Sequence, residues 1–240
     1  MNISRIFIST ALFSIFSINA FAQAKKVTEK KAVTKPATTL ESKETAGKTK
    51  VKITTDLGVI VVKLYDATPK HRDNFIKLVK QGFYDSLIFH RIIASFMIQG
   101  GDPMSKNAEP GAMLGMGGGD MERIPAEFNR NLIHKKGALA AARDGNPEKA
   151  SSACQFYIVQ GKPTSEDELK MMGQQKGYDY TPAQKNIYKT LGGTPFLDME
   201  YTVFGEVTSG LNIIDKIAAV EKGQGDRPLK DIRMKMEIIK

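Results

Sequence analysis

A single arginine interrupts an apolar stretch near the middle of the chain. Arg91 lies within Phe89–Ile93 (FHRII), and the segment Phe96–Asp102 (FMIQGGD) follows directly. Because side chains alternate between the two faces of a strand, Met97 and Gln99 should point the same way. Alone, Arg91 could be a strand-edge arginine that reaches out to water. Its neighbours instead favour a cation beside an apolar groove.

Two segments far along the chain could complete this groove. They are Gln155–Tyr157 (QFY) and Phe196–Asp198 (FLD), and each combines an aromatic ring with a polar side chain. We therefore expect arginine, glutamine, methionine and aromatic side chains to gather around one apolar surface.

Such a groove suits isomerisation of an X-Pro peptide bond. The reaction breaks no covalent bond, so it requires neither a nucleophile nor a metal, and we expect no cofactor. Its barrier of about 18–20 kcal/mol comes from amide resonance, which is lost in the twisted transition state. A guanidinium that donates to the prolyl nitrogen and the neighbouring carbonyl would favour that state, because arginine stays protonated and holds its donors in a fixed fork. An apolar pocket would exclude water and strengthen these contacts.

Motifs for other chemistries fail on their spacing. The run 71–73 (HRD) is like a kinase catalytic loop, but Leu78 stands where the metal-binding asparagine should be. The glycines of 115–119 lack the Lys-Ser/Thr pair of a phosphate loop. The three histidines are scattered, with no cysteine or carboxylate at ligand spacing, so we expect no metal.

The formal charge of +9 is concentrated near the amino terminus. Residues 25–50 carry +5, whereas 51–240 carry only +3. A nearly balanced body is not a nucleic-acid footprint, so we expect no nucleic-acid partner. Cys154 is the only cysteine, which rules out an internal disulfide, and we expect it to be a small buried hydrophobe.

The first 22 residues are typical of a signal peptide. Arg5 supplies a positive start, 6–18 is mostly apolar, and 20–22 (AFA) gives a cleavage site before Gln23. The alternative, a membrane anchor, is disfavoured because the apolar run is shorter than about 20 residues and contains Ser, Thr and Asn. We expect export, to the periplasm or by secretion, and no membrane span after cleavage.

Residues 23–50 are rich in Lys and Thr and have almost no large apolar side chains. Such a segment cannot offset its ordering entropy, so we expect a disordered tether. A basic patch that touches anionic lipid or peptidoglycan is the alternative.

The body, 51–240, alternates between short strands and few helices. Helices are predicted at 68–81, opened by Thr68 as cap and Pro69, and at 211–219. Strands are predicted at 51–55, 59–64, 87–93, 96–98, 138–142, 155–159, 201–205 and 232–239. This balance favours a β-barrel or sandwich over βαβ units.

One segment, 160–194, differs from the rest of the body. Capping boxes begin at Ser165, with Glu168 as partner, and at Thr181, with Gln184. We interpret 160–194 as a helical insertion between two strands.

These motifs, in this order, resemble the cyclophilins. The resemblance covers about 51–159 and 195–240, and it rests on 68–75, FHRII, FMIQGGD, QFYI at 155–158 and VFG at 203–205. It implies a mainly β fold, an eight-stranded antiparallel closed β-barrel capped by two α-helices. The insertion is similar to those in cyclophilins of Bacteroidetes-like bacteria, so the resemblance is to a bacterial, exported member.

The resemblance also implies roles for individual residues. Arg91 would be the catalytic arginine, and Gln99 and Gln155 would position the peptide. Ala142 and Arg143 would form a backbone rim for residues before the proline. The proline pocket would be lined by Phe96, Met97, Tyr157 and Leu197, with Phe196 and Tyr201 beside it.

Several positions depart from the family pattern. Tyr157 stands where Phe is common and Arg143 where Asn is usual. Phe196 occupies the position often held by Trp, and Tyr201 replaces a pocket His. Because cyclosporin binding in the family relies on that Trp, we expect weak cyclosporin binding.

Two other functions remain open at this point. A binding module or chaperone could hold proline-containing polypeptides without turnover. Such a protein would not need Arg91, so the presence of this arginine favours an enzyme. A basic surface-binding protein could act through 25–50. The favoured hypothesis is a monomeric X-Pro isomerase that assists folding of exported proteins. The insertion 160–194 could influence which substrates are bound, or it could have no functional role.

Overall fold

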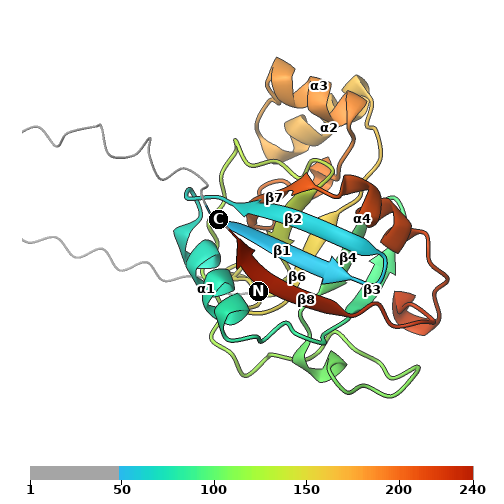
Figure 1. Cartoon of the computed structure of the whole chain (residues 1–240). Coiled ribbons are helices and arrows are strands. Elements are labelled where there is room, and N and C mark those ends of the chain that lie inside the picture. The colour runs from blue at the N-terminus through green and yellow to red at the C-terminus, as the bar shows by residue number, and fades with distance from the viewer. Residues whose placement is uncertain (1–48, 240) are drawn as a thin grey trace, which may run out of the picture. The chain divides into compact units, whose positions relative to one another are not determined.

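Eight strands form one antiparallel sheet in the computed structural model, which describes residues 49–239 (Figure 1). The order across the sheet is β3-β4-β6-β5-β7-β2-β1-β8. The strands are β1 Lys50–Thr55, β2 Gly58–Leu64, β3 Phe89–Ile93, β4 Met97–Gly100, β5 Ala138–Ala141, β6 Phe156–Val159, β7 Val203–Ser209 and β8 Met234–Ile239. Each predicted strand is confirmed to within a few residues. The predicted signal peptide, and the tether up to residue 48, lie outside the described residues.

The sheet is curled but open, so the expectation of a closed barrel is corrected. Strands β3 and β8 stand at its two ends and share no ladder. One antiparallel bridge, between Ile88 and Arg233, joins the segments just before them. It does not extend into a ladder, and the chain ahead of Ile232 bends at Leu229 and Lys230.

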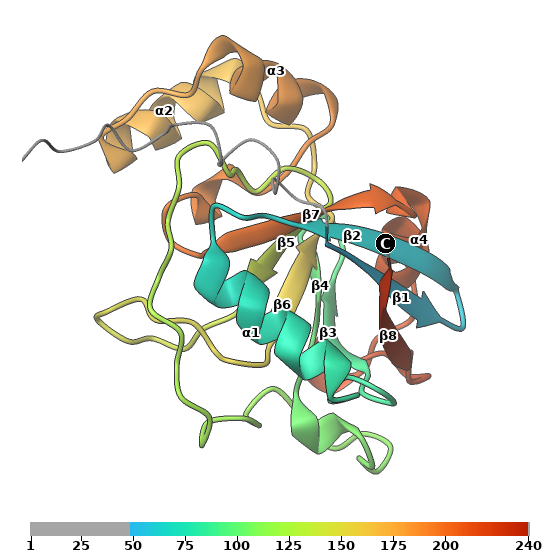
Figure 2. The same ribbon diagram turned by 60° about the vertical axis from the view of Figure 1, so that its left-hand side comes forward.

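The main core lies between the curled sheet and two helices, α1 (Pro69–Lys80) and α4 (Leu211–Ala218), which lie at opposite ends of the sheet (Figure 2). The ring of Phe75 meets those of Phe156 and Phe204 edge-on, at 5.8 and 5.3 Å between centroids. Cys154 is buried in this core as expected, and burial raises the pKa of its thiol. Burial of this apolar surface is the dominant stabilising term.

Thr68 is the N-cap residue of helix α1 and Pro69 its first residue, as predicted. The Thr68 side chain makes no bond to the first turn. Instead, the carboxylate of Glu127 accepts from the backbone N–H groups of Lys70 and His71, at 3.1 and 3.0 Å, and from Nδ1 of His71 at 2.7 Å. A distant carboxylate therefore satisfies the free N–H groups and complements the positive helix end.

The insertion forms two helices, α2 (Glu166–Lys176) and α3 (Pro182–Thr190), which stand beside the sheet in Figure 1. Both predicted capping boxes are confirmed, with Ser165 and Thr181 each bonded to the third helical residue. Their buried side chains form a separate small core. Within the described residues, no helix has the length and apolar character to cross a bilayer.

Candidate active site

Arg91 and Gln99 face each other on the paired strands β3 and β4. Nη1 of Arg91 donates to Oε1 of Gln99 at 3.5 Å, and the Arg91 side chain is 44% exposed. On its other side, Nε lies 3.8 Å from Oδ2 of Asp226, in the short helical turn η3 (Gln224–Asp226). The guanidinium is thus held from two sides and remains open to a ligand.

Sequence reasoning missed Asp226. It lies in a segment without apolar periodicity, where only glycines and a proline, 223–228 (GQGDRP), indicate a turn. No local pattern connects this segment with β3, so its proximity to Arg91 is a product of the tertiary fold.

A hollow of about 140 Å³ opens beside Arg91. It brings together nine of the eleven predicted site residues: Arg91, Phe96, Met97, Gln99, Ala142, Arg143, Tyr157, Leu197 and Tyr201. Met97 and Gln99 both line it, which confirms that they share a face of β4. The floor is apolar, because Met97, Tyr157 and Leu197 are all buried.

An aromatic and cationic rim surrounds the hollow. The guanidinium of Arg143 lies over the ring of Tyr201 at 4.6 Å, a cation–π distance. Phe196 does not line the hollow; it is 49% exposed and packs against Phe96 with ring centroids 5.6 Å apart. It therefore extends the apolar wall outward.

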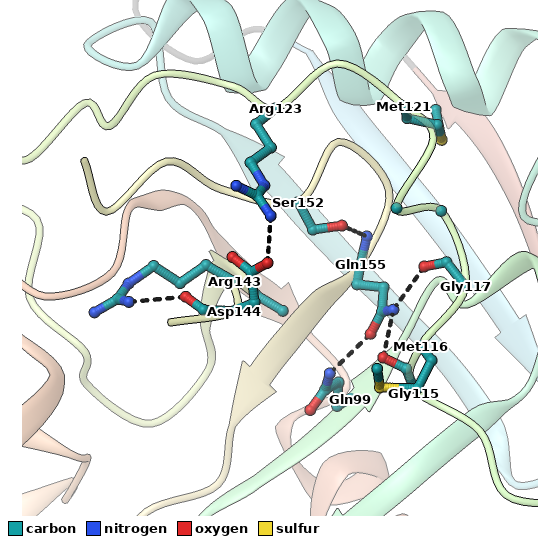
Figure 3. A pocket seen from close by; sticks show the side chains of 13 residues that line it. Gln99, Gly115, Met116, Gly117, Met121, Arg123, Arg143, Asp144, Ser152 and Gln155 are labelled. Carbon is teal, nitrogen blue, oxygen red and sulfur yellow. Dashed lines mark hydrogen bonds and ion pairs between the residues drawn. The ribbon is translucent and has the colours of Figure 1, made fainter. Parts of the chain in front are cut away.

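Gln155 does not line the first hollow but lines a larger neighbouring one of about 390 Å³ (Figure 3). Its Nε2 donates to the carbonyls of Gly115 and Gly117, both at 2.9 Å, and its Oε1 accepts from Nε2 of Gln99 at 3.0 Å. Figure 3 shows Gln99 and Gln155 pointing toward each other. Gln99 contributes to both hollows.

The glycine-rich loop 115–119 lines the larger hollow. The sequence pattern drew attention to this loop only as a failed phosphate loop. Its signal was the density of glycines, which allows the backbone carbonyls to reach Gln155. Arg123 and Asp144 form an ion pair at the far side of the same hollow (Figure 3).

The predicted backbone rim, formed by Ala142 and Arg143, has fewer free main-chain groups than expected. The N–H of Ala142 donates to the carbonyl of Gln155 at 2.9 Å, and its own carbonyl accepts from the N–H of Ser152 at 2.8 Å. Within the described residues no hydrogen bond engages the backbone of Arg143. Arg143 is thus the rim residue with main-chain groups available to a peptide.

His90, next to Arg91, is buried and belongs to the scaffold. Both of its ring nitrogens lack a hydrogen-bond partner, and burial lowers its pKa to about 4. It stays neutral near pH 7.

Among the described residues no group of three His, Cys, Asp or Glu side chains could hold a metal ion. The site therefore offers the guanidinium groups of Arg91 and Arg143, two amides and an apolar floor.

Comparison with known proteins shows which family this chain resembles. The model of the family "Cyclophilin type peptidyl-prolyl cis-trans isomerase/CLD" matches residues 50–238. A "Putative peptidyl-prolyl cis-trans isomerase" of Staphylococcus aureus is 35% identical over 189 residues, which cover 78% of this chain and 89% of that protein. A "Putative bifunctional phosphatase/peptidyl-prolyl cis-trans isomerase" of Streptococcus pyogenes is 40% identical over 190 residues, 76% of this chain but only 37% of that protein.

Two solved structures have a similar fold. Both are of a cyclophilin type peptidyl-prolyl cis-trans isomerase from Cryptosporidium parvum, at 23% identity and covering 80% of this chain. The TM-scores are 0.60, and 0.57 for the crystal obtained with the dipeptide Ala-Pro; the coverage of the solved chains is 97% and 99%.

Proposed function

This chain belongs to the cyclophilin-type peptidyl-prolyl cis-trans isomerases, and from that membership we propose that it accelerates X-Pro isomerisation in exported polypeptides, with Arg91 as the catalytic side chain. The observation that carries the proposal is the open guanidinium of Arg91 beside a hollow with an apolar floor.

Arg91 would act on the transition state rather than on the bound substrate. Twisting the amide localises a lone pair on the prolyl nitrogen, which then accepts a hydrogen bond that a planar amide accepts poorly. A donor held at that point favours the twisted geometry selectively, as catalysis requires. Gln99 and Asp226 hold the guanidinium, so little side-chain freedom is lost at that moment.

The hollow would take the proline ring. Met97, Tyr157 and Leu197 supply a floor without free charge, and burial, together with neighbouring Tyr201 and Asp198, raises the pKa of Tyr157, so that its hydroxyl stays neutral. The free backbone of Arg143 would bind the residue before proline in the manner of an added strand. Gln99 and Gln155 would orient the peptide between the two hollows.

Export and assistance to folding are further parts of the proposal. They are supported by the signal-like first 22 residues and by the slowness of uncatalysed X-Pro isomerisation, which limits the folding of many chains. Mass spectrometry of the protein isolated from its native host should give a chain that starts at Gln23. An intact Met1 in mature protein would reject cleavage.

A protease-coupled assay on a proline-containing peptide tests the activity. We expect wild type to accelerate the slow phase and Arg91→Ala to lose at least about 100-fold in kcat/KM while remaining folded. Arg72→Ala is the matched control, because Arg72 lies on α1 and pairs with aspartates outside the site. If wild type leaves the slow phase unchanged yet binds the peptide, the protein is a binding module or chaperone.

A further inference from the structure

Asp198 is a buried carboxylate at the junction of the insertion and the proline pocket. It follows the short helical turn η2 (Pro195–Leu197) and is 3% exposed. Its Oδ1 accepts from the backbone N–H and Nδ1 of His134, both at 2.8 Å. Its Oδ2 accepts from the hydroxyls of Tyr180 and Tyr188, at 3.1 and 2.5 Å. The last two donors belong to the insertion.

The network continues from Asp198 into the pocket. Nε2 of His134 lies 3.0 Å from the hydroxyl of Tyr157, which lines the hollow. Because Nδ1 donates its proton to Asp198, Nε2 of a neutral His134 is an acceptor, and Tyr157 donates to it. One continuous set of hydrogen bonds thus joins Tyr188, Asp198, His134 and Tyr157.

The two tyrosines of the insertion are permanent donors. Burial, followed by the charge of Asp198, raises the pKa of both Tyr180 and Tyr188 well above the ordinary tyrosine value. Their hydroxyls therefore stay protonated and satisfy a carboxylate that would be costly to bury without them.

A second set of contacts ties the insertion to the pocket wall. Nζ of Lys176, at the end of α2, donates to the carbonyls of Phe196 and Asp198, at 3.0 and 2.5 Å. The hydroxyl of Tyr180 also lies 3.1 Å from the carbonyl of Pro195, so its single proton is shared between this carbonyl and Asp198. The segment 195–198, which carries Leu197 of the pocket floor, is held from the insertion side.

We propose that the insertion is a positioning element for the active site, in which Tyr180 and Tyr188 fix the pocket residue Tyr157 through Asp198 and His134. The inference rests on the proposed function of the hollow as the proline pocket. It also gives a reason for the tyrosine at position 157: a phenylalanine could fill the wall there but could not bond to His134.

A double-mutant cycle in Tyr157→Phe and Tyr188→Phe tests this coupling. Each substitution keeps the ring and removes one hydroxyl, so the fold should survive. We expect each single variant to lose about 3- to 10-fold in kcat/KM and the double variant to lose no more than the worse single one. Tyr84→Phe is the matched control, because it also removes one buried hydroxyl, which donates to the carbonyl of Cys154 at 3.2 Å and makes none of the four bonds to Asp198.

A spectroscopic measurement tests the same network without relying on turnover. The imidazole ¹⁵N signals of His134 should move in both Tyr157→Phe and Tyr188→Phe and stay in place in Tyr84→Phe. If wild type proves inactive, the proposed function fails, and these signals still decide whether the insertion reaches position 157. Unchanged His134 signals in Tyr188→Phe would overturn the inference. So would a loss of kcat/KM in the double variant equal to the product of the two single losses. A lower Tm with unchanged kcat and KM in the single variants would also overturn it.

Discussion

Gln99 stands between Arg91 and Gln155, accepting from the guanidinium of the former at 3.5 Å and donating to the amide of the latter at 3.0 Å. Through Gln155 the contacts reach the carbonyls of Gly115 and Gly117. The two amides therefore connect the guanidinium of Arg91 with the loop that lines the larger hollow, and Gln99 is the one in contact with Arg91.

Removing that amide should weaken catalysis without abolishing it. In Gln99→Ala, the guanidinium of Arg91 keeps its contact with Asp226 but loses its hydrogen bond to Gln99. The side-chain oxygen of Gln155 loses its hydrogen-bond donor. We expect kcat/KM to fall by about 5- to 20-fold, which corresponds to one or two hydrogen bonds. Steady-state assays with Gln81→Ala, an exposed glutamine at the end of α1, as the control would check this. Activity equal to that of the control would contradict a positioning role for Gln99.

Glu127→Ala should destabilise the fold while leaving the site intact. The substitution removes the acceptor for two N–H groups and one imidazole at the start of α1. We expect a loss of about 1–2 kcal/mol in the free energy of unfolding, the usual cost of a lost cap. Urea titration measures it, with exposed Glu122→Ala as the reference. Equal midpoints for the two variants would show that Glu127 does not cap the helix.

His90 should make stability depend on pH. Burial lowers its pKa to about 4, so below pH 6.5 the unfolded chain binds a proton that the native protein does not. Stability should thus be full above pH 6.5 and fall by up to about 3 kcal/mol as the pH drops to 4, since one pKa unit is worth about 1.4 kcal/mol.

Urea unfolding of His90→Leu between pH 4 and 7 isolates this contribution. Leucine needs no hydrogen-bond partner at a site where both imidazole nitrogens lack one. We expect a clearly smaller slope, with a remainder from His71, whose pKa burial also lowers. A slope as steep as in wild type would assign the acid sensitivity to other groups.

Cyclosporin should inhibit this protein weakly, because Phe196 has no indole N–H to donate. Phe196 is half exposed at the outer wall, where a larger ring can be accommodated. Phe196→Trp should therefore raise cyclosporin affinity by about tenfold or more, while peptide turnover changes little. Calorimetric titration would check this, and tight binding by wild type would refute the premise.

Local signals in the sequence predicted the elements well. The capping boxes at Ser165 and Thr181 are confirmed because their partners lie three residues away, within the reach of a local pattern. Strand alternation likewise placed Met97 and Gln99 in the same hollow. The resemblance supplied the distant members of the site, which alternation alone could not pair.

Contacts between distant segments could not be predicted from local sequence patterns. Thr68 is the N-cap residue of α1 as predicted, but the side-chain bonds to the first turn come from Glu127, in another part of the chain. Asp226 and His134 have ordinary surroundings in the sequence and become site neighbours only through folding. The sheet is open between β3 and β8, and no local strand signal indicates which two strands fail to pair.

Exchange NMR on an Ala-Pro peptide at equilibrium tests the central claim most directly, because it measures cis/trans interconversion and binding in one sample. Wild type should produce strong exchange between the cis and trans signals, and Arg91→Ala should return the rate to nearly the uncatalysed value while still binding the peptide. Arg91→Lys should recover only part of the loss, since lysine keeps the charge but not the fork. Exchange in Arg91→Ala as fast as in wild type would contradict catalysis by Arg91.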